Sequence, residues 1–309
     1  DVFPRFKTMR GYRVDRKAGW DCHGLPVELA VEKELGFTGK GDIEAYGVAA
    51  FNQKCRDSVL RHVGEFAALT DRMGYWVDMN DAYWTMDPAY VQSVWWSLKQ
   101  IFDKGLLVAD HRVSPYCPRC GTGLSDHELA QGYEDIVDPS VFVRMPVTSG
   151  SLAERFPGVS LLVWTTTPWT LVSNTAVAVK PDAVYQVVRV AGDLGEFGDS
   201  ELLVIAEELR EATLPEGHEV LASLPGRDLE HTGYSRPFDL VDIPDAHYVI
   251  LADYVTTEDG TGLVHQAPAF GADDLISCRS YGLPVVNPLL PDGTFDPDVP
   301  MVGGQFFKA

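Results

Sequence analysis

"VWTTTPWTL", residues 163–171, sets the architecture of the second half of this chain. Three threonines stand in a row between two tryptophans, and Pro168 follows them directly. A β-branched run that ends at a proline is typical of a strand that stops at a bend, because proline has no N–H to donate to the ladder. In such a strand Thr165 and Thr167 point to one face and Thr166 to the other.

This threonine run has two interpretations. Threonine favours strands, so the run has a purely structural explanation. Buried hydroxyls need hydrogen-bond partners, however, and a few polar groups among aromatic side chains are typical of a small-ligand pocket. On the second interpretation the hydroxyls of residues 165–167 contact a ligand, and Trp164 shapes the pocket.

Similar strand-forming runs surround the threonines. From about residue 140 the chain consists of short β-branched and aromatic runs separated by glycine, proline and aspartate. This texture predicts a β-rich barrel or sandwich. We expect helices to interrupt it near residues 205–212 and 272–281. The predicted strands lie in residues 140–147, 159–167, 175–179, 184–190, 201–206, 248–255 and 262–268.

Helical patterns fill the part of the chain before residue 110. Apolar residues recur there at helical spacing. Three of the segments end in glycine, and the last opens with Asp87 and Pro88, a typical cap and first-turn pair. The predicted helical segments are 2–10, 25–36, 43–74 and 88–105.

The charge balance changes near the same point. Residues 1–120 carry 16 basic and 16 acidic side chains, whereas residues 121–309 carry 9 basic and 29 acidic ones, which accounts for the net charge of −20. We therefore expect a domain boundary between about residues 110 and 140. The acidic second part argues against tight nonspecific nucleic-acid binding. A basic cluster within residues 5–17 fits either a solvated helix face or a phosphate contact.

Composition also bears on the compartment. The sequence has no run of about 18 apolar residues and no apolar signal-peptide stretch at its start, so we expect no membrane association. Its five cysteines are an odd number in a long chain without a secretory signal. Reduced thiols in the cytoplasm are therefore expected.

Two of the cysteines form the motif "YCPRCG". Cys117 and Cys120 have the spacing of a knuckle that gives two thiolates to tetrahedral zinc. A complete site needs two more ligands, and no second Cys-x-x-Cys occurs in the sequence. His111 or His127 would have to complete it without a standard spacing. A redox pair and a metal-free turn are the alternatives.

The run "GWDCHGLPVE", residues 19–28, is a candidate ligand loop between a strand and a helix. Gly19 and Gly24 permit unusual backbone angles and close approach of a ligand, and the Asp21 carboxylate suits an α-ammonium group. Alternatively, Asp21 and His23 hold a tight turn through bonds from side chain to backbone.

A second candidate site lies in "GTGLVHQAPAFGADD", residues 260–274. His265 follows a glycine-rich turn, and Asp274 stands at the start of a predicted helix. Asp273 and Asp274 can be explained as acids that interact with the helix dipole. That explanation leaves the histidine unaccounted for.

These motifs resemble the isoleucyl-tRNA synthetase family of class I aminoacyl-tRNA synthetases, over essentially the whole chain. His23 separates this family from the leucine enzymes, which typically carry phenylalanine at the matching place, and the valine enzymes have a different run there. The resembling segments are "PRFKTMRGYRVDRKAGWDCHGLPVELAVEKELG", "YCPRCGTGLSDHELAQGYED", "WTTTPWTLVSNTAVAV" and "GTGLVHQAPAFGADD".

The resemblance implies an α/β fold in three parts. Residues 1–110 would be part of a Rossmann-type catalytic domain, mostly helical in this chain. Residues 111–138 would be a zinc-ribbon-like connector that holds half a zinc site. Residues 139–309 would be most of an inserted β-rich barrel, the editing domain.

The same resemblance implies roles for the site residues. Asp21 would bind the ammonium group of isoleucine, and Gly19 would line the isoleucine pocket with Trp20 and His23 beside it. In the editing site Asp274 would bind the ammonium group of a mischarged valine, and His265 would be either a general base or a wall that limits side-chain size. The implied editing residues are Thr165, Thr166, Thr167, His265 and Asp274, with Trp164 and Asn174 contacting substrate.

The implied activity is charging of tRNA(Ile) with isoleucine and hydrolysis of Val-tRNA(Ile). Isoleucine exceeds valine by one methylene, which an apolar pocket converts into only about 1–3 kcal/mol, a limit for which the isoleucine enzyme is the standard worked example. A second pocket too small for isoleucine removes the error. We expect a cytoplasmic monomer with tRNA(Ile), isoleucine, valine, ATP, Mg²⁺ and zinc as partners.

Two ATP-binding signatures of the class are missing. Neither His-x-Gly-His nor Lys-Met-Ser-Lys-Ser occurs in residues 1–309. We therefore expect a portion of a longer enzyme that does not form isoleucyl-adenylate by itself. The alternatives are a valyl-tRNA synthetase and a free-standing trans-editing deacylase, which would need no loop around Asp21. A noncatalytic tRNA-binding module would instead show basic grooves.

Overall fold

The computed structural model describes residues 1–130, 133–191 and 200–309. Residues 131–132 of the expected connector and 192–199 of the expected β-rich domain lie outside the described residues. The chain divides into two compact units, Asp1–Asp110 and His111–Ala309. Across the described residues every helix is too short or too polar to span a bilayer.

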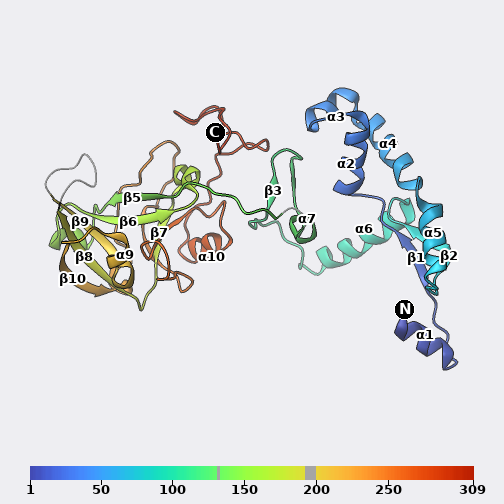
Figure 1. Cartoon of the computed structure of the whole chain (residues 1–309), viewed down its shortest axis with the longest axis horizontal. Coiled ribbons are helices and arrows are strands. Elements are labelled where there is room, and N and C mark those ends of the chain that lie inside the picture. The colour runs from blue at the N-terminus through green and yellow to red at the C-terminus, as the bar shows by residue number, and fades with distance from the viewer. Residues whose placement is uncertain (131–132, 192–199) are drawn as a thin grey trace. The chain divides into compact units, whose positions relative to one another are not determined.

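The first unit is mostly helical, as predicted (Figure 1). The segment expected as one long helical pattern from residue 43 to 74 forms separate helices, because the chain breaks at Gly47 with φ 101°. β1 and β2 form a two-stranded parallel sheet. This sheet is too small to establish a Rossmann-type domain, so that part of the fold class remains a prediction. The elements are α1 (Val2–Met9), β1 (Lys17–Trp20), α2 (Leu25–Leu35), α3 (Lys40–Tyr46), α4 (Val48–Leu60), α5 (Val63–Arg72), β2 (Asp78–Trp84) and α6 (Pro88–Asp103).

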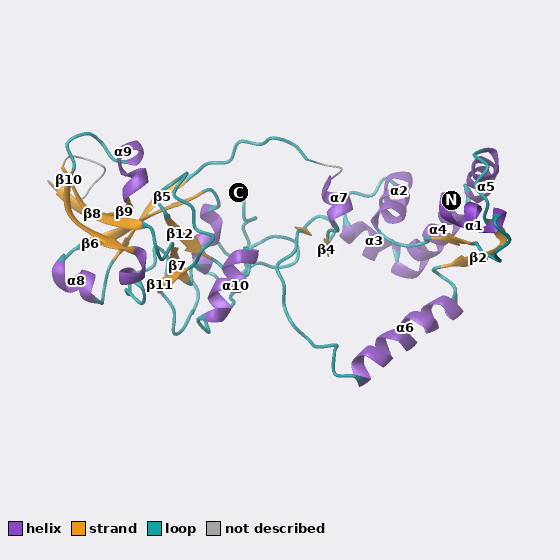
Figure 2. Ribbon diagram, turned by 90° about the horizontal axis from the view of Figure 1, so that it is seen from below, coloured by secondary structure: helices purple, strands orange, loops and turns teal. Residues whose placement is uncertain are grey.

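The second unit contains a curled, mixed sheet of eight strands (Figures 1 and 2). The strand order is β10-β8-β9-β6-β12-β7-β11, and β5 pairs with β6. The end strands β10 and β11 do not pair with each other within the described residues, so the sheet is a curled half-barrel. The prediction of a β-rich barrel or sandwich is thus confirmed in part. The strands are β5 (Val141–Pro146), β6 (Val159–Thr165), β7 (Ala176–Val179), β8 (Val184–Ala191), β9 (Ser200–Ala206), β10 (Glu219–Pro225), β11 (Tyr248–Leu251) and β12 (Leu263–Gln266).

The remaining elements of this unit are short. The helix expected at residues 272–281 is present, and the one expected near 205–212 consists of a 3₁₀ turn and one α-helical turn. The sequence did not predict β10, because its run "EVLASLP" contains one β-branched residue only. These elements are β3 (Tyr116–Cys117), β4 (Thr122–Gly123), α7 (Asp126–Ala130), α8 (Ser151–Arg155), η1 (Pro168–Ser173), η2 (Glu207–Leu209), α9 (Arg210–Thr213), η3 (Gly226–Leu229) and α10 (Ala272–Ser280).

β6 is the central strand of the half-barrel. One of its edges pairs with β5 along its whole length, and the other pairs first with β9 and then, at Trp164, with β12. β7 is buried on both faces, with Val177 and Val179 in one apolar cluster and Ala176 and Ala178 in another. A strand covered on both sides needs a continuous apolar run, which "AVAV" supplies.

A buried tyrosine ties β8 to the turn before β12. Tyr185 is fully buried, and its hydroxyl accepts from the Lys180 N–H (2.9 Å) and donates to the Gly262 carbonyl (2.7 Å). Burial raises the pKa of Tyr185 to about 12, so the hydroxyl keeps its proton. Gly262 has φ +75°, and a Cβ there would lie 2.4 Å from the Ala206 Cβ. Glycine is therefore required where β12 begins.

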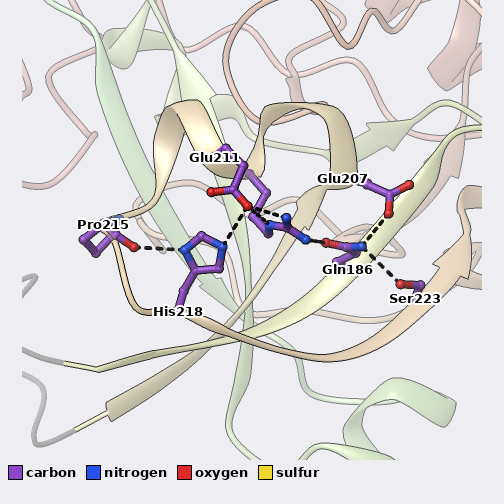
Figure 3. A network of polar contacts seen from close by, with 7 residues as sticks. Gln186, Glu207, Glu211, Pro215, His218 and Ser223 are labelled. Atoms are coloured by element: carbon purple, nitrogen blue, oxygen red, sulfur yellow. Dashed lines mark hydrogen bonds and ion pairs between the residues drawn. The ribbon is translucent and has the colours of Figure 1, made fainter.

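A polar network fixes the short helices η2 and α9 against the sheet (Figure 3). Gln186 of β8 is 3% exposed and donates to Glu207 Oε1 (2.7 Å) and to Ser223 Oγ of β10 (3.2 Å). Its side-chain carbonyl accepts from Arg210 Nη1 (2.5 Å). All hydrogen-bonding groups of this buried amide are thus engaged, as burial of polar groups requires.

Tyr185→Phe is expected to destabilise the second unit. The substitution leaves the Lys180 N–H and the Gly262 carbonyl without a partner, at a cost of about 1–3 kcal/mol in the free energy of unfolding. Urea unfolding followed by far-ultraviolet circular dichroism measures the loss. Tyr133→Phe, at a side chain that is 89% exposed, is the matched control. Equal stability of the two variants would contradict this account.

Candidate functional site

A cavity of about 910 Å³ opens in the second unit where β6 ends beside β12. Its walls come from the end of β6, from η1, from the segment between β12 and α10, from the segment before β3 and from the loops after α10. Lining residues include Arg112, Tyr116, Trp164, Thr165, Thr166, Thr167, Thr170, His265, Asp274, Leu290 and Phe307.

The threonine run forms one part of the cavity wall. β6 ends at Thr165, and Pro168 begins the 3₁₀ helix η1, so the predicted bend at the proline is confirmed. The hydroxyl oxygens of Thr165 and Thr167 lie 3.3 Å apart, and the Thr167 N–H donates to Thr165 Oγ1 (3.1 Å). Thr166 and Thr167 are exposed on the cavity side, whereas Thr165 is 8% exposed.

Thr170 extends this run of hydroxyls toward the histidine. Its Oγ1 donates to the Thr167 carbonyl (2.7 Å) and lies 3.3 Å from the Thr167 hydroxyl and 2.9 Å from His265 Nε2. Sequence reasoning missed this residue because it lies beyond Pro168. The available signal was its spacing of three from Thr167, which one helical turn brings together.

The hydrogen bonds around His265 define its tautomer. Asn174 Nδ2 lies 3.1 Å from the Ala176 carbonyl, which only an N–H can satisfy, and Tyr234 donates to Asn174 Oδ1 (2.7 Å). The same Nδ2 lies 2.8 Å from His265 Nδ1, which therefore accepts. The proton of the imidazole is then on Nε2 and is donated to Thr170. Burial lowers the pKa of His265 to about 4, so the ring is neutral at physiological pH.

This network changes the interpretation of two predicted residues. Both nitrogens of His265 are engaged within the protein, so the ring cannot accept a proton from a water molecule without breaking a buried bond. Asn174 is fully buried and does not line the cavity. It was expected to contact substrate, but its side chain holds His265 because it lies beneath the end of η1.

Asp274 stands in the first turn of α10 and faces the cavity. Its Oδ2 accepts from the Ala267 N–H (2.8 Å), and its Oδ1 accepts from the Tyr254 hydroxyl (3.3 Å), which also donates to Gln266 Oε1 (2.9 Å). A Cβ at Gly271 would lie 2.6 Å from the Asp274 carboxyl carbon, so only glycine leaves room for this side chain.

The electrostatic setting of this carboxylate favours a cationic ligand. Burial raises the pKa of Asp274, with the hydrogen bond from Ala267 acting in the opposite direction. No lysine or arginine of the described residues forms an ion pair with it. A partly desolvated carboxylate without a cation is stabilised by a ligand that brings one. Asp273 is exposed, as an acid at the start of a helix is expected to be.

Aromatic side chains shape the cavity walls. The Trp164 ring packs on Gly260, where a Cβ would lie 2.7 Å from it. Trp169 makes edge and tilted contacts with Phe270 and Phe307 at centroid distances of 4.9 and 4.6 Å. The expectation of hydroxyls in an aromatic setting is met.

The cysteine motif lies next to the cavity. Cys117 Sγ accepts from the Cys120 N–H (3.4 Å), and the Tyr116 hydroxyl donates to the Pro291 carbonyl (2.9 Å). Burial, and then the contact with Cys117, raises the pKa of Cys120. No group of three His, Cys, Asp or Glu side chains suited to a metal occurs in the part of the chain that the structure describes. The half zinc site expected from the motif therefore remains a prediction.

The ligand loop predicted in the first unit is held by Thr85. Its hydroxyl accepts from the Cys22 N–H (2.9 Å), donates to Asp21 (3.4 Å) and lies 3.1 Å from His23 Nδ1. The His23 N–H also lies 3.4 Å from Asp21 Oδ1, a contact that the tight-turn interpretation predicts. Asp21 and His23 remain exposed. Thr85 was missed because it is more than 60 residues away in sequence.

The strand before this loop is packed with aromatic rings. A Cβ at Gly19 would lie 2.3 Å from the Tyr83 ring, so that ring occupies the space beside the glycine. Trp20 stacks on Trp84 at a centroid distance of 5.4 Å. The structure therefore brings residues 19–23 together in the first unit, and the threonines, His265 and Asp274 together in the second.

Comparison with known proteins gives a consistent result. The family model "tRNA synthetases class I (I, L, M and V)" matches residues 1–276. An isoleucine–tRNA ligase of Streptomyces coelicolor is 68% identical over 100% of this chain and 29% of its own length. An isoleucine–tRNA ligase of Thermus thermophilus is 52% identical over 95% of this chain and 27% of its own length. The chain thus spans less than a third of these relatives.

A solved structure is also similar. The editing domain of the P. falciparum cytosolic leucyl-tRNA synthetase aligns with 46% of this chain and 67% of its own, with 11% identity and a TM-score of 0.37.

The buried His265 predicts a specific dependence of stability on pH. The unfolded chain takes up a proton near the ordinary histidine pKa of 6.5, but the folded chain does so only near pH 4. The neutral His265 contributes its full stabilisation of the folded chain above pH 6.5. As the pH falls toward 4, the free energy of unfolding therefore drops by up to about 3 kcal/mol. In His265→Gln this part of the pH dependence is absent.

Urea unfolding at pH 7.5, 6 and 5 tests this expectation. The difference in unfolding free energy between the unaltered chain and His265→Gln should shrink as the pH falls. His62→Gln, at an exposed imidazole, is the control and should follow the unaltered chain. A difference that stays constant over this range would show that His265 does not titrate as described.

Proposed function

The chain belongs to the class I tRNA synthetase family, and we propose that the cavity of its second unit is the editing site of an isoleucyl-tRNA synthetase. Valine wrongly esterified to tRNA(Ile) would be hydrolysed there. One observation carries the proposal: a partly buried carboxylate that lacks a cationic partner among the described residues shares a cavity with the hydroxyls at the end of β6.

Asp274 would recognise the amino group. The α-ammonium of the valyl ester supplies the positive charge that the carboxylate lacks within the protein. The Ala267 N–H and the Tyr254 hydroxyl fix the orientation of the two carboxylate oxygens. A charge-assisted hydrogen bond in a partly dry cavity is stronger and more directional than one in water.

The threonine hydroxyls would hold the ester and the attacking water. Water adds to the ester carbonyl carbon, the bond from that carbon to the ribose oxygen breaks, and a proton from the water reaches the ribose oxygen. The products are valine and a free tRNA end. Thr166 and Thr167 are exposed to the cavity and can donate to the developing oxyanion or to the water. Positioning and oxyanion stabilisation are the two contributions that these residues supply.

His265 would limit the size of the side chain that enters. Its neutral ring is bonded on both sides, to Asn174 and to Thr170, so it forms a rigid wall. A wall of this kind admits valine and excludes the longer isoleucine. The proposal therefore assigns His265 to size selection and no proton transfer to it.

The first unit would contribute to charging in the longer relatives. There the exposed carboxylate of Asp21 would bind isoleucine, which ATP and Mg²⁺ activate before transfer to tRNA(Ile). Cys117 and Cys120 would give two thiolates to a structural zinc ion, which takes part in no step of the hydrolysis. All five cysteines are free thiols, which supports a cytoplasmic location. We propose a monomer.

The alternatives have weaker support. The relatives at 68% and 52% identity carry the name isoleucine–tRNA ligase, which does not favour a valyl-tRNA synthetase or a free-standing deacylase.

Asp274→Asn is expected to abolish most of the deacylation of Val-tRNA(Ile). The amide keeps the size of the side chain but loses the charge, and loss of one partner of a buried charge pair costs about 2–5 kcal/mol, or about 400-fold in rate at the middle of that range. Deacylation by the chain is measured with labelled valine. Asp273→Asn, at the exposed neighbour, is the control and should keep full activity. Equal activity of both variants would refute the assignment.

The same assay tests the size filter. We expect Val-tRNA(Ile) to be deacylated at least about tenfold faster than Ile-tRNA(Ile), since a well-fitted apolar wall discriminates a methylene by about 1–3 kcal/mol. Equal rates for the two esters would remove the wall assigned to His265 while leaving Asp274 as the amine site.

A further inference from the structure

The charges around the cavity are arranged unevenly. Three formally charged side chains line it among the described residues, namely Arg112, Asp259 and Asp274. Asp274 stands at the start of α10, and Arg112 belongs to the segment before β3. The described lining therefore has one cationic side chain, on a different segment of the chain from the carboxylate that would bind the amine.

The backbone on both sides of Arg112 is fixed to the second unit. The His111 carbonyl accepts from Arg279 Nη2 of α10 (2.8 Å), and the Tyr116 hydroxyl donates to the Pro291 carbonyl (2.9 Å). These contacts hold the segment from two sides. The backbone at Arg112 is thus positioned by contacts of His111 and Tyr116, without a contact from the Arg112 side chain.

The guanidinium of Arg112 is uncommitted. Arg112 is exposed and forms no hydrogen bond or ion pair with any described residue. Other arginines of the unit, such as Arg144 and Arg236, are engaged by neighbouring acids. An arginine that lines a cavity, on a segment held by its neighbours and with five free N–H donors, is suited to a planar or tetrahedral oxyanion.

The acidic surroundings increase the need for a cation at the cavity if an anionic ligand is to bind. Residues 111–309 carry 11 basic and 29 acidic side chains, so the unit as a whole repels a polyanion. A ligand that carries phosphate needs a local positive charge to reach the cavity against that field. Arg112 is the one cationic side chain among the described residues that line the cavity.

We propose that Arg112 binds the phosphodiester that precedes the terminal ribose of the aminoacyl-tRNA. The inference rests on the proposed function and adds a phosphate subsite to it. The substrate has a positive end, the valine ammonium, and a negative end, the phosphate, and the cavity lining offers a carboxylate and a guanidinium on different segments of the chain. The ester would then bind with its amine at Asp274 and its phosphate at Arg112.

Two substrates separate this subsite from the hydrolytic site. Val-tRNA(Ile) carries the phosphate, whereas 3′-O-valyl-adenosine carries the same ester without it. Arg112→Ala should lower kcat/KM for Val-tRNA(Ile) about tenfold, mainly through KM, and leave kcat/KM for valyl-adenosine unchanged. Arg112→Lys should retain part of the effect, because lysine keeps the charge but loses the planar fork.

Salt and control variants sharpen the measurement. The deficit of Arg112→Ala with Val-tRNA(Ile) should shrink as salt rises, since an exposed charge contact is screened. Arg155→Ala, at an exposed arginine of α8 that does not line the cavity, should match the unaltered chain. Circular dichroism verifies that each variant is folded.

The outcomes are distinguishable. If Arg112→Ala affects both esters equally or neither, the phosphate subsite is wrong and the proposed hydrolysis stands. If the unaltered chain hydrolyses valyl-adenosine but not Val-tRNA(Ile), the subsite is also overturned. Hydrolysis of neither ester by the unaltered chain overturns the proposed function, and this inference with it.

Discussion

The hydrogen bond from the Asn174 amide to His265 Nδ1 governs the site. Asn174 Nδ2 also serves a carbonyl of β7, so the amide cannot turn over, and the imidazole must present a lone pair to it. The ring proton then points to Thr170, whose own proton goes to the Thr167 carbonyl. The Tyr234 hydroxyl completes this chain of hydrogen bonds by donating to Asn174 Oδ1. Each donor has one acceptor, so a buried polar network becomes a rigid wall rather than a source of instability.

Burial acts on both titratable groups of the cavity, but with different outcomes. It keeps His265 neutral, and the network then uses both of its nitrogens. Asp274 accepts from neutral donors, among them the Ala267 N–H and a shared tyrosine hydroxyl, and pairs with no lysine or arginine among the described residues, so its charge is left for a ligand. On the proposed function, the cavity combines an unreactive histidine wall with a carboxylate whose charge a ligand completes.

Sequence reasoning identified the site residues that lie near the ends of helices and strands. The threonine run, His265 and Asp274 each lie beside a proline or glycine that marks a turn, and the structure brings them into one cavity. Thr170, Tyr234 and Tyr254 act through contacts that only the tertiary structure creates, with Tyr234 60 residues from Asn174. The sequence could not predict whether the sheet closes. Pairing of the end strands depends on the curvature of the sheet, whereas the sequence shows only the alternation of apolar and polar residues. The unpredicted β10 shows that a strand with few β-branched residues is formed by its neighbours.

Gly271 carries a consequence for how this family can diverge. The space that its missing Cβ would fill is taken by the Asp274 carboxyl carbon at 2.6 Å. Even the smallest mutational step there, to alanine, would displace the acid that faces the ligand. Substitution of Gly271 is therefore expected only where Asp274 is also replaced. The two positions should change together or not at all.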